Sequence, residues 1–167
     1  FYDTRLGKGE EIAKYTHNYY SGISQIKATT FYWYNNKKAA DLLPVNSDDA
    51  MTTSETYRGE WTDNDLAWNS NAIISKTFYD TRLGKGEEIA KYTHNIRSGA
   101  DTSTTNTTFY LYNGMDPANP LVISDDLMTA SETYRGEWNG RAAAWAAKTI
   151  MSKTYYSTHL GKGNEIA

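Results

Sequence analysis

The chain has 167 residues, no cysteine and a formal net charge of −3 at pH 7. A chain of this length buries enough surface to fold as one domain or two small ones, and the lack of cysteine excludes disulfides and thiolate chemistry. The basic residues are spread along the chain, so we expect no nucleic-acid partner. No apolar run reaches the about 20 residues that span a bilayer, so we expect no membrane insertion and a soluble protein, secreted or cytoplasmic.

The chain contains an internal repeat. Residues 1–18, FYDTRLGKGEEIAKYTHN, recur unchanged at residues 78–95, and a shorter copy, YYSTHLGKGNEIA, occupies residues 155–167. The octet SETYRGEW at residues 54–61 returns at residues 131–138 with the same offset of 77. Since a repeated unit repeats whatever it binds, this period favours a multivalent binding protein.

The period divides the chain into units. We predict a first repeat unit at residues 1–77, a second at residues 78–154, and a partial third copy, a hairpin, at residues 155–167. This spare hairpin either closes the sheet, pairs with another chain to form a homo-oligomer, or belongs to a longer array.

In chain order, the first predicted strand is residues 29–34, with a copy at residues 107–112, both rich in threonine and aromatic residues. Trp33 becomes Leu111 in the copy, which favours packing, so the face of Phe31 and Trp33 is expected to be core. The other face is then the wetter one. It offers either a sugar platform or a cross-strand ladder, built from Tyr32, Tyr34, Tyr110 and Tyr112.

The next elements complete the unit. Residues 51–61 are predicted as a half-exposed strand, and residues 62–71 as a short helix whose copy at residues 139–148 is rich in alanine. Residues 73–80 and 88–94 are predicted as a hairpin joined by a glycine-containing turn. Each unit thus has about four strands and one short helix. The predicted fold is mainly β, an internally duplicated antiparallel barrel, sandwich or propeller-like architecture.

The repeated motif YRGEW is the strongest candidate site. In an extended strand Arg58 and Glu60 share one face, and Tyr57 and Trp61 share the other. Arginine beside glutamate presents donors next to an acceptor, which suits vicinal sugar hydroxyls, and a bulge at Gly59 would bring an aromatic ring to them. The alternative is an exposed ion pair above a core tyrosine and tryptophan. The second copy of the candidate site consists of Tyr134, Arg135, Glu137 and Trp138.

This combination of arginine, glutamate and tryptophan is similar to that of fucose-binding propeller lectins. The likeness is one of residue types alone, because the blades of those lectins differ in length from this repeat.

Other chemistry is not indicated by the sequence. His17, His94 and His159 lack metal-binding spacing and are expected at solvated strand ends, so no metal or cofactor is predicted. No constellation of nucleophile, base and orienting group is visible, which argues against an enzyme. The leading hypothesis is a multivalent, lectin-like protein that binds glycans or glycoproteins. The alternative is a structural or adhesive repeat protein that self-associates without a small ligand.

Overall fold

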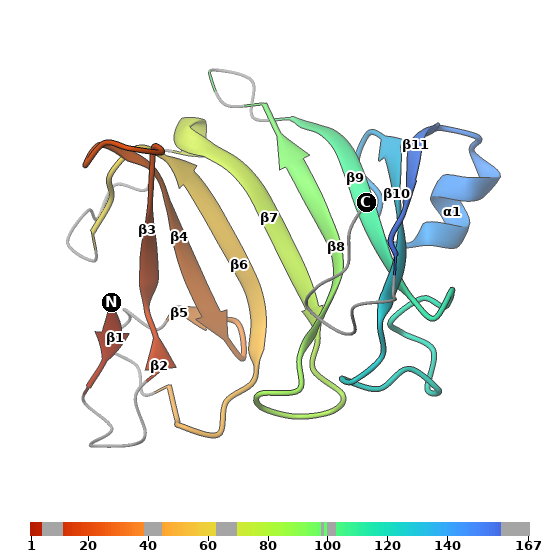
Figure 1. Ribbon diagram of the computed structural model, residues 1–167, viewed down its shortest axis with the longest axis horizontal. Coiled ribbons are helices and arrows are strands. Elements are labelled where there is room, and N and C mark those ends of the chain that lie inside the picture. The colour runs from red at the N-terminus through yellow and green to blue at the C-terminus, as the bar shows by residue number, and fades with distance from the viewer. Residues whose placement is uncertain (5–11, 39–44, 63–69, 98, 100–102, 158–167) are drawn as a thin grey trace.

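The computed structural model describes residues 1–4, 12–38, 45–62, 70–97, 99 and 103–157 (Figure 1). Eight of its strands form one continuous antiparallel sheet. In chain order they are β3 (Tyr15–Tyr19), β4 (Ile26–Tyr34), β6 (Met51–Arg58), β7 (Ile73–Asp80), β8 (Ile89–Ile96), β9 (Thr104–Tyr112), β10 (Met128–Arg135) and β11 (Ile150–Tyr155). Their spatial order is β11-β10-β9-β8-β7-β6-β4-β3.

Short elements flank this sheet. β1 (Tyr2–Asp3) pairs with β2 (Ile12–Ala13), and β5 (Lys37–Lys38) pairs with β4. The helical elements are the 3-10 turn η1 (Ser70–Ala72) and the helix α1 (Arg141–Ala146). In Figure 1 the sheet runs from β3 on one side to β11 on the other, where α1 lies.

The prediction of a mainly β fold is confirmed, but the sheet is not closed into a barrel, because β3 and β11 stand at opposite ends of its order. Sandwiches and propellers divide their strands among separate sheets, whereas these eight strands are continuous. The sheet is continuous because every strand from β6 onward pairs with the next strand in the chain, including β6 with β7 across the two predicted units. The predicted boundary between residues 77 and 78 therefore lies inside β7.

The predicted elements are found with two differences. Strand β6 ends at Arg58, before the predicted end at residue 61, because Gly59 has a φ of +84° and leaves the extended region. The helix predicted in residues 139–148 is α1, in which Ala144 is buried. Most of its predicted counterpart, residues 63–69, lies outside the described residues.

Two tight turns follow β4 and β9, at positions where the composition indicates only loops. Asn35 and Asn36 have φ of +46° and +63°, and Asn113 and Gly114 have φ of +49° and +77°. Two successive positive φ values define the turn that best matches the twist of a hairpin, and asparagine and glycine adopt them at the least cost. The first of these turns connects β4 to β5.

Buried apolar residues form four small clusters. One cluster consists of Tyr15, Phe31 and Tyr57, and a second consists of Phe109, Tyr134 and Ala144. Phe31 is the member that belongs to β4, and Phe109 is the member that belongs to β9. Tyr32 and Tyr110 are the next residues along those strands, and they pack against the other two clusters. Successive side chains of a strand point to opposite faces, so each face of the sheet carries two clusters.

We call the side of Phe31 and Phe109 the aromatic face, and the opposite side the hydroxyl face. Register extends the aromatic face across the sheet, since Tyr92 of β8 stands opposite both Phe78 of β7 and Phe109 of β9. The hydroxyl face is lined with cross-strand hydrogen bonds between hydroxyl groups. These include Thr30 with Thr56 at 3.0 Å, Thr77 with Thr93 at 2.8 Å, and Thr108 with Thr133 at 3.0 Å.

Candidate functional site

The YRGEW motif forms a tight turn at the end of β6. The Trp61 indole N–H donates to the Arg58 carbonyl at 2.7 Å. The Thr29 hydroxyl, which is fully buried, donates to the Gly59 carbonyl at 2.9 Å and accepts from the Trp61 backbone N–H at 3.1 Å. Gly59 is needed for the positive φ, and Thr29 fastens the turn to the neighbouring strand β4.

The same contacts recur 77 residues later. Trp138 donates to the Arg135 carbonyl at 2.7 Å, and Thr107 bonds to Gly136 at 2.9 Å and to Trp138 at 3.1 Å. Gly136 has a φ of +86°. The turn thus gives a physical reason, independent of any ligand, why these residues are identical in the two copies.

The predicted site residues of this motif separate into two groups. Arg58 and Glu60 are exposed, as are Arg135 and Glu137. Tyr57 is buried, its hydroxyl donates to Glu55 at 2.8 Å, and its ring lies 6.4 Å from that of Trp61. Arg58 and Glu60 therefore face solvent, while Tyr57 is buried and Trp61 packs half-buried against the cluster of Tyr57.

The second copy shows the same separation. Tyr134 is fully buried and donates to Glu132 at 2.8 Å, and Trp138 packs half-buried against the cluster of Tyr134. Sugar binding at the exposed pairs, Arg58 with Glu60 and Arg135 with Glu137, remains a prediction.

The tyrosines of β4 and β9 are less exposed than predicted. Tyr34 and Tyr112 are 8% and 9% exposed, so the expectation that they lie on the wetter face is wrong. The pairing of β4 with β6 shifts register between Trp33 and Tyr34, and Tyr34 packs with Ile12 and Val45. Burial raises the pKa of Tyr34 to about 12.

Tyr32 and Tyr110 are half-buried and take part in a cross-strand ladder. The Tyr32 hydroxyl lies 3.1 Å from that of Thr16, and the Tyr110 hydroxyl lies 2.9 Å from that of Thr93. Each ring thus lies over its neighbouring strand, and its one polar group already has a protein partner.

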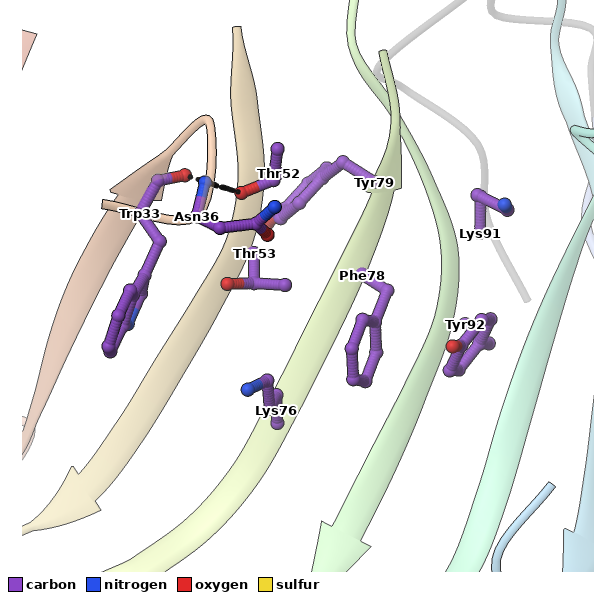
Figure 2. A pocket seen from close by; sticks show the side chains of 9 residues that line it. All are labelled: Trp33, Asn36, Thr52, Thr53, Lys76, Phe78, Tyr79, Lys91 and Tyr92. Atoms are coloured by element: carbon purple, nitrogen blue, oxygen red, sulfur yellow. Dashed lines mark hydrogen bonds between the residues drawn. The ribbon is translucent and has the colours of Figure 1, made fainter. Parts of the chain in front are cut away.

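A pocket of about 300 Å³ opens elsewhere, on the aromatic face across β4, β6, β7 and β8. Figure 2 shows that it brings together aromatic and polar side chains from strands far apart in sequence. The lining residues are Trp33, Asn36, Thr52, Thr53, Lys76, Phe78, Tyr79, Lys91 and Tyr92. Its volume is at the lower end of the range for small-molecule sites.

The rings define the shape of this pocket. Phe78 and Tyr92 are stacked, with ring centroids 4.6 Å apart and an angle of 26° between their planes. Trp33 stands across the pocket from them, and Lys76 projects between Trp33 and Phe78 (Figure 2). Stacking fixes the two rings of β7 and β8 as a rigid apolar wall.

Lys76 is one of the two lysines that line the pocket. Its ammonium group lies 5.9 Å from the Trp33 ring centroid and 5.4 Å from the Phe78 ring centroid, within the range of cation–π attraction. Glu55 accepts from it at 2.9 Å, and the Glu55 side chain is only 10% exposed. The carboxylate holds the ammonium in place while leaving two of its three N–H donors for other partners.

His94 packs against both rings of this wall, with its ring centroid 5.2 Å from those of Phe78 and Tyr92. Burial raises the pKa of Tyr92, and the charge of Glu137 adds to the shift, so its hydroxyl stays protonated at neutral pH. His94 is 6% exposed, and its Nε2 donates to the Trp138 carbonyl at 3.1 Å. The expectation that His94 lies at a solvated strand end is therefore wrong, since it is part of the aromatic face.

Part of the pocket recurs in the second copy. Lys153, the counterpart of Lys76, contacts Glu132 at 2.9 Å and lies 5.0 Å from the Tyr155 ring centroid. Leu111 replaces Trp33 and is only 2% exposed. The charged pair and one ring are thus kept, while the indole is not.

Sequence reasoning missed this pocket because it treated the face of Trp33 as core. The pocket arises because two aromatic residues flank a small one: Trp33 on β4 and Phe78 on β7 both stand opposite Thr53 of β6. Aromatic residues on either side of a threonine leave a hollow above the smaller side chain. Finding it required the strand order, which spacing alone does not give.

Among the described residues, no group of three histidine, aspartate or glutamate side chains is placed to hold a metal ion. Within that same part of the chain, no helix has the length and apolar character needed to cross a bilayer. Comparisons with protein-family models, with curated proteins and with solved structures each found no match.

Proposed function

We propose that this protein binds carbohydrate without catalysis, and that the pocket between β4 and β8 receives one sugar ring. The observation that supports this most directly is the arrangement of Trp33 opposite the stacked pair Phe78 and Tyr92, with Lys76 between them. A pyranose has flat C–H faces and a rim of hydroxyls, so it needs aromatic walls and polar groups in the same small space.

The polar groups of the pocket suit hydroxyls. Lys76 and Lys91 are donors, and the Thr53 hydroxyl can both donate and accept, whereas the Thr52 hydroxyl already donates to the Trp33 carbonyl and accepts from the Asn36 N–H. A sugar hydroxyl also does both, so it can be matched by such a set without a charged ligand group. Glu55 balances the charge of Lys76, so this lysine can serve as a hydrogen-bond donor to a neutral ligand.

The proposal includes multivalency. A repeated sequence that retains the pair of Lys153 and Glu132, and the turn after β10, supports a duplicated module with more than one binding surface. Two linked weak sites bind a multivalent glycan more tightly than either site alone, by raising the effective concentration for the second contact.

The experiment is a glycan array followed by calorimetry with the best sugar. Trp33→Leu is the key variant, because it copies the residue that the chain itself uses at Leu111 and so keeps the fold. We expect its affinity to fall about 2- to 12-fold, as loss of one stacking contact worth about 0.5 to 1.5 kcal/mol would give. Trp145→Ala, at a ring that is 60% exposed on α1, is the matched control and should bind normally.

The double variant Arg58→Ala with Arg135→Ala tests the turns separately. Both guanidinium groups are exposed, so folding should persist, and binding in the pocket should be unaffected. Binding that survives Trp33→Leu but is lost in the double variant would move the site to the YRGEW turns. A chain that binds no glycan would refute the function itself.

A second candidate function is self-association without a small ligand. Within the described residues, β3 and β11 end the order of the sheet, which favours it, because a strand edge without a full partner is a template for another chain. Assembly that depends on concentration but that no sugar alters, together with a silent glycan array, would support this function in place of carbohydrate binding.

A further inference from the structure

The two ends of the sheet have related sequences. β11 (Ile150–Tyr155) reads IMSKTY, and β7, 77 residues earlier, begins IISKTF. β3 at the other end reads YTHNY, and β8 contains YTHNI at the same offset. The two strands that end the sheet are therefore near-copies of two strands that pair with each other inside it.

The internal pair shows how such strands fit together. β7 and β8 are antiparallel, with Ser75 opposite Asn95, Lys76 opposite His94, and Thr77 opposite Thr93. The hydroxyls of this last pair are 2.8 Å apart. Every one of these residues has an identical counterpart at the ends of the sheet, so the contacts are encoded there as well.

Exposure shows what the end strand lacks. In β7, Ile73, Ile74 and Phe78 are half-buried. Their counterparts in β11 are far more exposed, with values of 43% for Ile150, 54% for Met151 and 69% for Tyr155. The same positions are covered where a strand lies alongside and open where the described residues place none.

We propose that β11 of one chain pairs with β3 of a second copy, head to tail, in the register of β7 with β8. Ser152 then stands opposite Asn18 of the second copy, Lys153 opposite His17, and Thr154 opposite Thr16. The surface is heterologous, because β11 of one copy meets β3 of the next, so assembly adds copies in a row or closes a ring.

Residues Phe1–Asp3 regulate this junction. Phe1 stacks on Tyr15 with centroids 4.3 Å apart, as Phe78 does on Tyr92, and Tyr2 and Asp3 stand opposite Ala13 and Ile12. The equivalent pairs in the internal ladder are Tyr79 with Ala90 and Asp80 with Ile89. The N-terminal segment thus holds the places that residues 155–157 of another copy would take, and it must leave for the junction to reach full length.

A full junction also adds aromatic residues beside the Lys153–Glu132 pair. Tyr15 and Lys14 are the counterparts of Tyr92 and Lys91. Brought beside Tyr155 and Lys153, they would restore the stacked wall that Phe78 and Tyr92 form in the first pocket. The second copy would contribute these residues, which gives the association a role in ligand binding.

Cysteine cross-linking tests the register, since the chain has no cysteine of its own. Two single variants, Thr16→Cys and Thr154→Cys, are checked for native circular dichroism and mixed under mild oxidation. We expect an interchain disulfide between them. The matched control mixture, Thr16→Cys with Ser152→Cys, is two residues out of register and should give about tenfold less, because disulfide geometry is specific.

Three results would overturn the proposal. These are equal yields from the two mixtures, equal cross-linking of Thr16→Cys with itself, and a monomeric mass with no cross-link at every concentration.

Removing the competing segment gives an independent readout. Deletion of residues 1–3, or the milder Phe1→Ala, should raise the average mass seen by light scattering at a fixed concentration. An unchanged or lower mass in variants with native circular dichroism would contradict the competition between Phe1–Asp3 and residues 155–157.

Discussion

Glu132 is a buried carboxylate that contacts two cations, and we expect its replacement to lower the stability of the fold. It is fully buried and accepts from Arg141 at 2.6 Å and 3.0 Å, from Lys153 at 2.9 Å and from the Tyr134 hydroxyl at 2.8 Å. Glu132→Gln keeps the shape and removes the charge, which leaves two cations facing a neutral amide. We expect a large loss of stability, because breaking a buried ion pair leaves charge uncompensated.

The pKa gives the size and the pH window of the effect. Hydrogen bonds from Arg141, with those from Lys153 and Tyr134, lower the pKa of Glu132 from 4.5 to about 2. A depressed carboxyl pKa stabilises the folded state fully above the unfolded value, and the effect is lost as pH falls through the folded value. The shift corresponds to about 3 kcal/mol, present above about pH 4.5 and lost towards about pH 2.

Urea unfolding at a series of pH values measures this directly. Glu132→Gln should cost about 3 kcal/mol at pH 7, and its unfolding free energy should fall less steeply than that of the parent between pH 4.5 and pH 2. Glu55→Gln is the matched control: Glu55 contacts Lys76 and Tyr57 but is 10% exposed, so its loss should be smaller. Equal losses in the two variants, or parallel pH profiles for parent and Glu132→Gln, would refute the reasoning.

Two further predictions concern the turn and the buried tyrosine. Thr29→Val removes a buried hydroxyl that both donates to Gly59 and accepts from Trp61, so unfolding by urea should show a loss of about 1 to 3 kcal/mol; a neutral result would mean that the turn does not depend on it. Burial raises the pKa of Tyr134 to about 12, so its contribution is complete below pH 10 and lost towards pH 12. Tyr134→Phe should therefore flatten the fall in stability over that window, and an unchanged alkaline profile would contradict the assignment.

Strand positions were predictable because local composition determined them. Residues 29–34 and 107–112 lie within β4 and β9, and the predicted hairpin corresponds to β7 and β8. β-Branched and aromatic residues favour a pleated surface, and their runs end at glycine and asparagine. The short helix α1 followed equally from its alanines.

The candidate site was harder to predict, because it depends on which strands are neighbours. The separation of Arg58 from Tyr57 across the sheet followed from alternation, but the burial of Tyr34 arises from a register shift that no residue pattern announces. Equally, Trp33 and Tyr92 lie on strands that are not adjacent, and only the order of the sheet brings them to one pocket.

Dividing the apolar residues into four small clusters, two on each face, has a consequence for cooperativity. Among the described residues no cluster spans the sheet, so each strand is stabilised mainly by its immediate neighbours. A lesion near β3 would then loosen its own flank while amide hydrogens in β9 and β10 kept their slow exchange. The sheet would unfold locally, from its edge strands towards its centre, and not in one cooperative step.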